Sequence, residues 1–165
     1  MTRKQLSSNV LHHTSEHLLY EFSMFNSLAQ AMMSGVFGQG ALYNAVLESF
    51  TLHARVLLDF LYAEKPKVDD VIAEDYFDTP ADWLTARPKK TEQLGVIHKR
   101  VGKEVAHLTY ARLDVTAEEK QWQFAQIANE MNAVFDTFLT NVTKEKLGPS
   151  WGKVKVHHQA DDGKA

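Results

Sequence analysis

The fold class is decided by the stretch Leu11-His-His-Thr-Ser-Glu-His-Leu18-Leu-Tyr-Glu-Phe22-Ser-Met-Phe25-Asn-Ser-Leu28-Ala-Gln-Ala-Met32. Its large apolar residues recur at steps of three, four or seven. Because an α-helix turns about 100° per residue, these steps place the apolar side chains on one face. The spacing predicts an amphipathic helix from about residue 8 to residue 33, which ends at Ser34-Gly35.

Three further segments show the same helical spacing of apolar residues, at about 41–63, 91–112 and 116–142. Thr116 is followed three residues later by Glu119, which is the capping-box pattern of a helix start. Strand-like alternation over a useful length and internal repeats are both missing from the sequence. The simplest architecture is therefore all-α, a four-helix up-and-down bundle with a long connection between the second and third helices.

That connection is about 27 residues long and contains three prolines, which is long for a segment without structure of its own. We expect a short helix within residues 68–77. Tyr76, Phe77 and Trp83 should pack on the bundle, because exposing three large aromatic side chains would be costly. The chain after Gly148 is polar. We therefore predict a helical bundle domain at 1–147 and a loose C-terminal tail at 148–165.

The composition is that of an ordinary globular domain, with 165 residues, 44% hydrophobic and 24% charged. The absence of cysteine excludes disulfides, thiolate metal sites and cysteine nucleophiles. No apolar run approaches the roughly 18 residues of a membrane span, and the start does not read as a secretory signal. We expect a cytoplasmic protein with no membrane partner.

The net charge of −3 argues against a general nucleic-acid coat protein, but the charge is unevenly distributed. Residues 64–82 carry seven acidic side chains against two lysines, whereas residues 87–104 carry six basic side chains against two acidic ones. The second stretch would favour a polyanion locally. A solvated helix face is the alternative interpretation of the same charges.

The basic stretch contains Arg100-Val-Gly-Lys-Glu-Val-Ala-His107 within the third predicted helix. Seven α-helical steps return to within roughly 20° of the starting direction, so Arg100 and His107 should leave the same face. A guanidinium can hold a phosphodiester while an imidazole moves a proton. This pair is the candidate catalytic site.

An arginine followed after six residues by a histidine, late in a small helical bundle, resembles the signature of the HEPN superfamily. The resemblance rests on Arg100 and His107 and on the order of the helices. Active HEPN proteins are metal-independent endoribonucleases, often toxins or phage-defence effectors, in which two protomers line one cleft. The resemblance implies a homodimer that cleaves RNA without a cofactor. A cognate antitoxin or partner protein is also implied.

In this interpretation His107 would act as general acid and base on the ribose 2′-hydroxyl, and Arg100 would stabilise the developing charge. Lys99 and Lys103 would hold phosphates, and Tyr110 would stack on a base or donate its hydroxyl. Glu104 lies on the same helix edge as Arg100, and we expect it to support the site formed by Arg100 and His107.

Two other functions use the same residues. A non-catalytic interaction module would bind a partner protein or RNA through this edge, and Val101 favours it because active HEPN members often have a polar residue after the arginine. A metal-binding bundle could use Glu104-x-x-His107, since di-iron bundles share that spacing. Its further ligands would come from the following side chains: His12, His13, Glu16, His17 and Glu48. We expect no metal site.

The second predicted helix carries His53 on its apolar stripe. A histidine there is usually a hydrogen-bonded core residue, although it could support the site if the second and third helices are neighbours. Arg55 and Asp59 are four residues apart and read as an ordinary helix ion pair without a catalytic role.

Overall fold

The computed structural model describes residues 6–106, 110–113, 116 and 121–154, and these residues form helices and turns without a strand. The predicted all-α class is confirmed. The α-helices are α1 (Ser8–Met33), α2 (Ala41–Leu61), α3 (Pro80–Ala86), α4 (Glu92–Arg100) and α5 (Phe124–Asn141). The short elements are η1 (Ala73–Tyr76), η2 (Val101–Ala106), η3 (Tyr110–Leu113), η4 (Lys144–Lys146) and η5 (Pro149–Lys153), of which η2 is a π-helix and the others are 3₁₀-helices.

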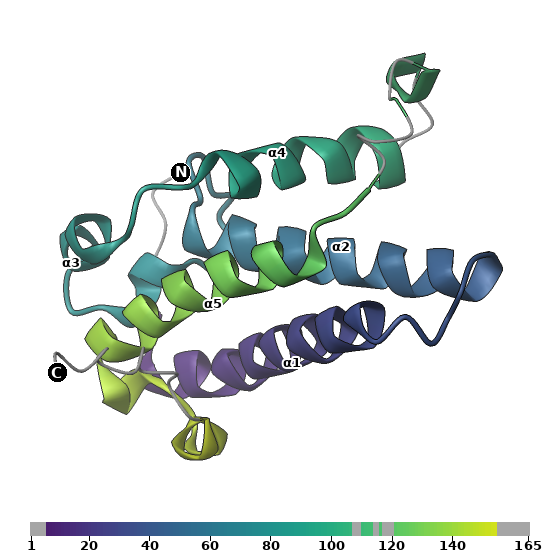
Figure 1. The fold of residues 1–165 in the computed structure, drawn as a ribbon. Coiled ribbons are helices and arrows are strands. Elements are labelled where there is room, and N and C mark those ends of the chain that lie inside the picture. The colour runs from purple at the N-terminus through teal and green to yellow at the C-terminus, as the bar shows by residue number, and fades with distance from the viewer. Residues whose placement is uncertain (1–5, 107–109, 114–115, 117–120, 155–165) are drawn as a thin grey trace, which may run out of the picture.

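The helices surround one core. Helix α1 packs against α2 and α5, and α4 packs against the same two helices. Along the chain, α1, α2, α4 and α5 run in alternating directions (Figure 1). None of the helices among the described residues is long and apolar enough to cross a bilayer.

The core is built from the apolar stripes of the helices and is rich in aromatic rings. Phe25 of α1 stacks on Phe50 of α2 with ring centroids 5.1 Å apart, and Phe138 of α5 meets Trp83 of α3 edge to face at 5.7 Å. All four side chains are buried. Such ring pairs add to the free energy gained by burying apolar surface, so the apolar stripes of these helices contribute to stability.

The first predicted helix has the bounds of α1. The third predicted segment is not one continuous α-helix. Its start is correct, since Thr91 Oγ1 accepts a hydrogen bond from Leu94 N at 3.2 Å and caps α4. The α-helical part ends at Arg100, however, and the chain goes on directly into the π-helix η2. Gly102 contributes to this break, because glycine lowers helix propensity by about 1 kcal/mol.

The predicted start of the fourth helix at Thr116 is wrong. Thr116 is not helical, and α5 begins only at Phe124. Trp122 is the physical reason, since it is buried against Arg100 ahead of the helix. Its tertiary contact overrides the local capping pattern, whose Glu119 lies outside the described residues.

The connection between α2 and α4 contains η1 and α3. Tyr76, Phe77 and Trp83 are buried, as predicted. Trp83 Nε1 donates to Leu61 O at 3.0 Å, which ties α3 to the end of α2. Helix α3 was not predicted, although Thr79-Pro80 marks its start, with proline at a first-turn position where no backbone donor is needed.

The first part of the predicted loose tail is held on α1. Trp151 is buried, and its Nε1 donates to Ser15 O at 2.9 Å. Gly148 N donates to Ser15 Oγ at 2.7 Å. Residues 148–154 therefore belong to the folded body, because one tryptophan supplies enough apolar surface to fix a polar segment. Residues 155–165 lie outside the described residues.

Candidate functional site

Arg100 lies at the end of α4, and each of its three guanidinium nitrogens donates a hydrogen bond. Its Nε and Nη2 donate to the two carboxylate oxygens of Glu104 at 2.8 and 2.9 Å. The side chains are only 17% and 19% exposed, respectively. A bidentate, charge-assisted pair of this kind is stronger than an ordinary surface ion pair, since little water competes for it.

The remaining side of the same guanidinium faces the segment before α5. Its carbon lies 4.1 Å from the Trp122 ring centre, and Nη1 donates to Gln121 O at 3.4 Å. Arg100 thus joins α4 to the start of α5 through a cation–π contact and hydrogen bonds. Glu104 contacts Arg100 directly and neutralises its charge, and its predicted supporting role at a catalytic site stays a prediction.

The other predicted residues of this edge are only partly placed. His107 lies outside the described residues, so the pairing of Arg100 with His107 stays a prediction. The α-helical geometry behind that pairing does not run through η2, because a π-helix closes its hydrogen bonds five residues on and turns less per residue. Lys99 and Lys103 are exposed. Tyr110 is 90% exposed on η3.

His53 is a buried core residue of α2. Its Nδ1 lies 2.6 Å from Glu21 Oε2 of α1, and Tyr20 meets its ring edge to face with centroids 5.9 Å apart. This partner lies on α1 and not on α4. His53 therefore joins the first two helices, which agrees with the core-residue interpretation.

Among the described residues, no three histidine or acidic side chains come close enough together to hold a metal ion. His12 and Glu16 instead face the η4–η5 segment. The His12 ring contacts Glu145 O, and Glu16 Oε1 accepts from Ser150 N at 3.4 Å.

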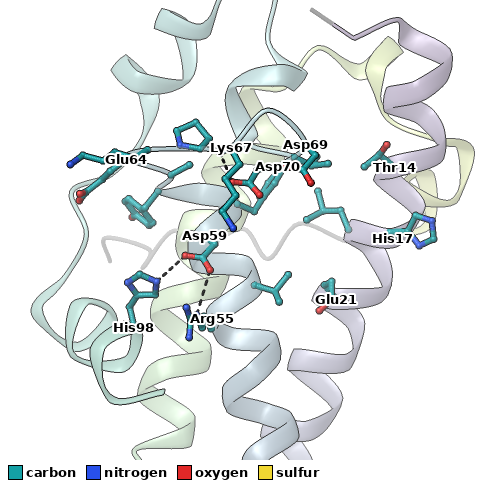
Figure 2. A pocket seen from close by; sticks show the side chains of 18 of the residues that line it. Thr14, His17, Glu21, Arg55, Asp59, Glu64, Lys67, Asp69, Asp70 and His98 are labelled. Atoms are coloured by element: carbon teal, nitrogen blue, oxygen red, sulfur yellow. Dashed lines mark hydrogen bonds and ion pairs between the residues drawn. The ribbon is translucent and has the colours of Figure 1, made fainter. Parts of the chain in front are cut away.

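A second candidate site is an open cleft of about 780 Å³ between α1, α2, α4 and the chain that follows α2. Figure 2 shows Asp59 of α2 at its centre, with Arg55 and His98 beside it. His98 Nε2 lies 2.8 Å from Asp59 Oδ1, and Arg55 Nε lies 3.6 Å from Asp59 Oδ2. The side chains of Arg55, His98 and Asp59 are 37%, 41% and 56% exposed, so solutes can reach them.

This arrangement joins an acid–base group to an anion-binding group. When His98 is neutral and its Nε2 donates to Asp59, its other ring nitrogen is an acceptor, as in a histidine oriented by a carboxylate. Arg55 adds a fixed positive charge. Tyr62 lines the same cleft, and burial raises the pKa of its hydroxyl while the Arg87 charge opposes the rise.

Sequence reasoning recognised the Arg55–Asp59 pair but not the site it belongs to. The i, i+4 spacing gives the pair, whereas His98 lies 39 residues further along the chain. Only the packing of α4 on α2 brings His98 to Asp59. No local signal in the sequence reports that contact.

Comparison of the chain with protein-family models, with curated proteins and with solved structures found no match. The geometry of the two candidate sites is therefore the ground for assigning a function.

Proposed function

We propose that this protein is a HEPN-like interaction domain that associates as a homodimer and does not use Arg100 for RNA cleavage. The observation that carries the proposal is the engagement of the Arg100 guanidinium by Glu104 and Trp122. The HEPN-like assignment itself rests on the helix order and on the spacing of Arg100 and His107 in the sequence.

A catalytic arginine must turn toward the phosphate when charge develops there. Freeing Arg100 would break two hydrogen bonds between charged groups, each worth about 1.5–3 kcal/mol, together with a cation–π contact. Glu104 would also repel a phosphodiester that approached the same edge. These costs favour a structural role for Arg100 over a catalytic one.

The surface that supports association is η3. Tyr110 and Leu113 are 90% and 82% exposed, and η3 stands away from the long helices as a short green turn (Figure 1). Exposed leucine and tyrosine side chains on one projecting turn gain free energy when a partner covers them. A second copy is the partner that the resemblance implies.

Light scattering of the full chain tests the association. We expect a dimer at micromolar concentration, and Leu113→Asp should shift it to the monomer by placing a charge in the contact. Leu84→Asp is the matched control, since Leu84 is 52% exposed on α3, far along the chain from η3. A monomeric parent, or equal loss of the dimer in both variants, would contradict the proposal.

Metal-independent RNA cleavage is the second candidate function. It is favoured by the exposed Lys99 and Tyr110, which lie on either side of His107 in the sequence and are available to a nucleic acid. In that case the protein would act as a toxin or phage-defence nuclease. This candidate predicts cleavage in EDTA that disappears in His107→Ala while folding and association remain.

A further inference from the structure

The α1–α2 tip, by which we mean residues 22–47, contains no aspartate, glutamate, lysine, arginine or histidine. A segment of this length ordinarily carries about six charged side chains. The tip comprises the second half of α1, the turn at 34–40 and the first third of α2. Figure 1 shows it at the end of the molecule away from α3. One whole end of the helical body is therefore free of charge along its own chain.

Large apolar side chains are exposed where the α1–α2 tip turns. Met33, Val36 and Leu42 are 49%, 74% and 62% exposed, respectively. Gly35 and Gly38 have φ angles of 69° and 57°, which side chains other than glycine rarely adopt, so they hold a tight turn on either side of Val36. Exposed apolar side chains that gather on one projecting turn gain free energy when a partner takes them out of water.

The two helix ends in the tip also lack the charges that favour helix ends in water. The last turn of α1 has no basic side chain, and the first turn of α2 has no acidic side chain. A charge of the right sign at either position would stabilise its helix through the helix dipole. The same charge would have to be desolvated if the tip entered an apolar phase. The lack of both charges therefore favours a tip that leaves water when it functions.

The lack of charge on every side of the tip favours a lipid surface over a protein partner. A protein partner covers one face of a helix pair, so the other exposed positions could keep charged side chains as usual. In the tip, the exposed polar positions on the two helices are all uncharged: Ser23, Ser27, Gln30 and Asn44. A lipid surface surrounds an inserted hairpin, so a charge on any side would cost free energy.

The length of the uncharged segment fits shallow insertion. Residues 22–33 of α1 span about 18 Å, and residues 41–47 of α2 span about 10 Å. Glu48 is exposed and begins the charged surface of α2. Segments that lie in the membrane interface are buried to a depth of about 5–10 Å. The uncharged part of the shorter leg therefore reaches the depth that such insertion requires.

We propose that the α1–α2 tip inserts shallowly into the surface of a phospholipid membrane, with Met33, Val36 and Leu42 in the lipid. Because the tip carries no cation, it does not select anionic headgroups, and a neutral phosphatidylcholine surface suits it. This proposal departs from the sequence-based expectation of no membrane partner, which rested on the lack of an apolar run long enough to span a bilayer. Insertion uses a different segment from η3 and does not rest on association or RNA cleavage.

Flotation of the full chain with phosphatidylcholine vesicles at millimolar lipid tests the proposal. The parent should float, and Val36→Asp and Leu42→Asp should each lower the ratio of bound to free protein about tenfold or more, because each places a charge in lipid. Leu42 lies in the first turn of α2, where aspartate favours the helix, so Leu42→Asp should keep or raise the unfolding temperature. Leu84→Asp is the matched control, since Leu84 is 52% exposed on α3, and it should change the ratio less than about twofold.

The proposal is overturned if the parent does not float with phosphatidylcholine, if it floats only with vesicles that contain phosphatidylserine, or if Leu84→Asp loses as much binding as Val36→Asp. Light scattering of Val36→Asp without lipid tests the alternative of a protein partner. A mass that differs from that of the parent would show that the tip is a contact between copies of this chain, and would also overturn the proposal. Association through η3 is measured separately with Leu113→Asp, so failure of that contact and failure of insertion are distinguishable.

Discussion

Arg100 is the residue where sequence pattern and structure assign different roles. The sequence pattern predicts that Arg100 binds a phosphate, whereas its observed partners are Glu104, Trp122 and a backbone oxygen. A residue with these contacts stabilises the junction of α4 and α5. Replacement of Arg100 should therefore lower the free energy of unfolding, whatever the protein binds.

We expect Arg100→Ala to lower the free energy of unfolding by about 2 kcal/mol, since it removes a bidentate pair and a cation–π contact and leaves the mostly buried Glu104 carboxylate without its partner. Arg100→Lys should recover only part of the loss, because an ammonium cannot form the same fork. Urea unfolding measures both. Lys99→Ala, one residue earlier on exposed surface, is the control and should cost less than about 0.5 kcal/mol.

Tyr76 links stability to alkaline pH. It is buried, its hydroxyl donates to Leu11 O at 3.2 Å, and burial raises its pKa, helped by the Asp75 charge. A raised pKa means that the folded state keeps the proton longer than the unfolded state. Stability is therefore full below the ordinary tyrosine pKa of about 10 and is lost as the pH rises above it.

Tyr76→Phe should cost about 1 kcal/mol at pH 7 through the lost hydrogen bond. Above about pH 10 the variant should lose less stability than the parent, because it no longer has the buried hydroxyl that resists ionisation. Urea unfolding at several pH values checks this. A gap between parent and variant that stays constant across the whole range would show that Tyr76 does not contribute to the pH dependence.

At the scale of elements, the attachment of η5 to α1 depends on a close approach at Gly148. A Cβ atom there would lie 2.3 Å from Glu16 Oε1, 3.0 Å from His12 O and 3.1 Å from Ser15 Oγ. Gly148→Ala should therefore destabilise the protein by about 1–3 kcal/mol, since the backbone oxygen cannot move as freely as a side-chain end. Thermal unfolding provides the measurement.

Gly102 is the matched control for Gly148 and also tests the π-helix η2. A Cβ atom there would meet only Arg55 Nη1, at 3.9 Å, which is an ordinary contact. Gly102→Ala should leave stability unchanged or raise it by up to about 1 kcal/mol through helix propensity. A loss in Gly102→Ala as large as that in Gly148→Ala would mean that η2 needs glycine for its backbone.

At the scale of the whole molecule, the sequence predicted the features that depend on local periodicity, such as helix bounds and buried aromatic residues. It did not predict the features that depend on contacts between segments far apart in the chain. The apolar stripe of α1 gave its bounds, and the three aromatic residues of the long connection are buried as expected. The late start of α5 follows from the contact of Trp122 with Arg100, 22 residues earlier in the chain. The Asp59–His98 pair likewise exists only because α4 packs on α2.

At this scale the molecule is a helical body with an exposed turn at η3, through which we propose that it associates, and an open cleft at Asp59. We propose that Arg100 is structural and that its edge of the molecule does not cleave RNA. Treatment of mixed RNA with the purified protein in EDTA, with His107→Ala in parallel, tests this claim most directly. We predict that neither protein cleaves RNA above the level of a buffer control. Cleavage by the parent that is lost in a folded His107→Ala variant would contradict the account.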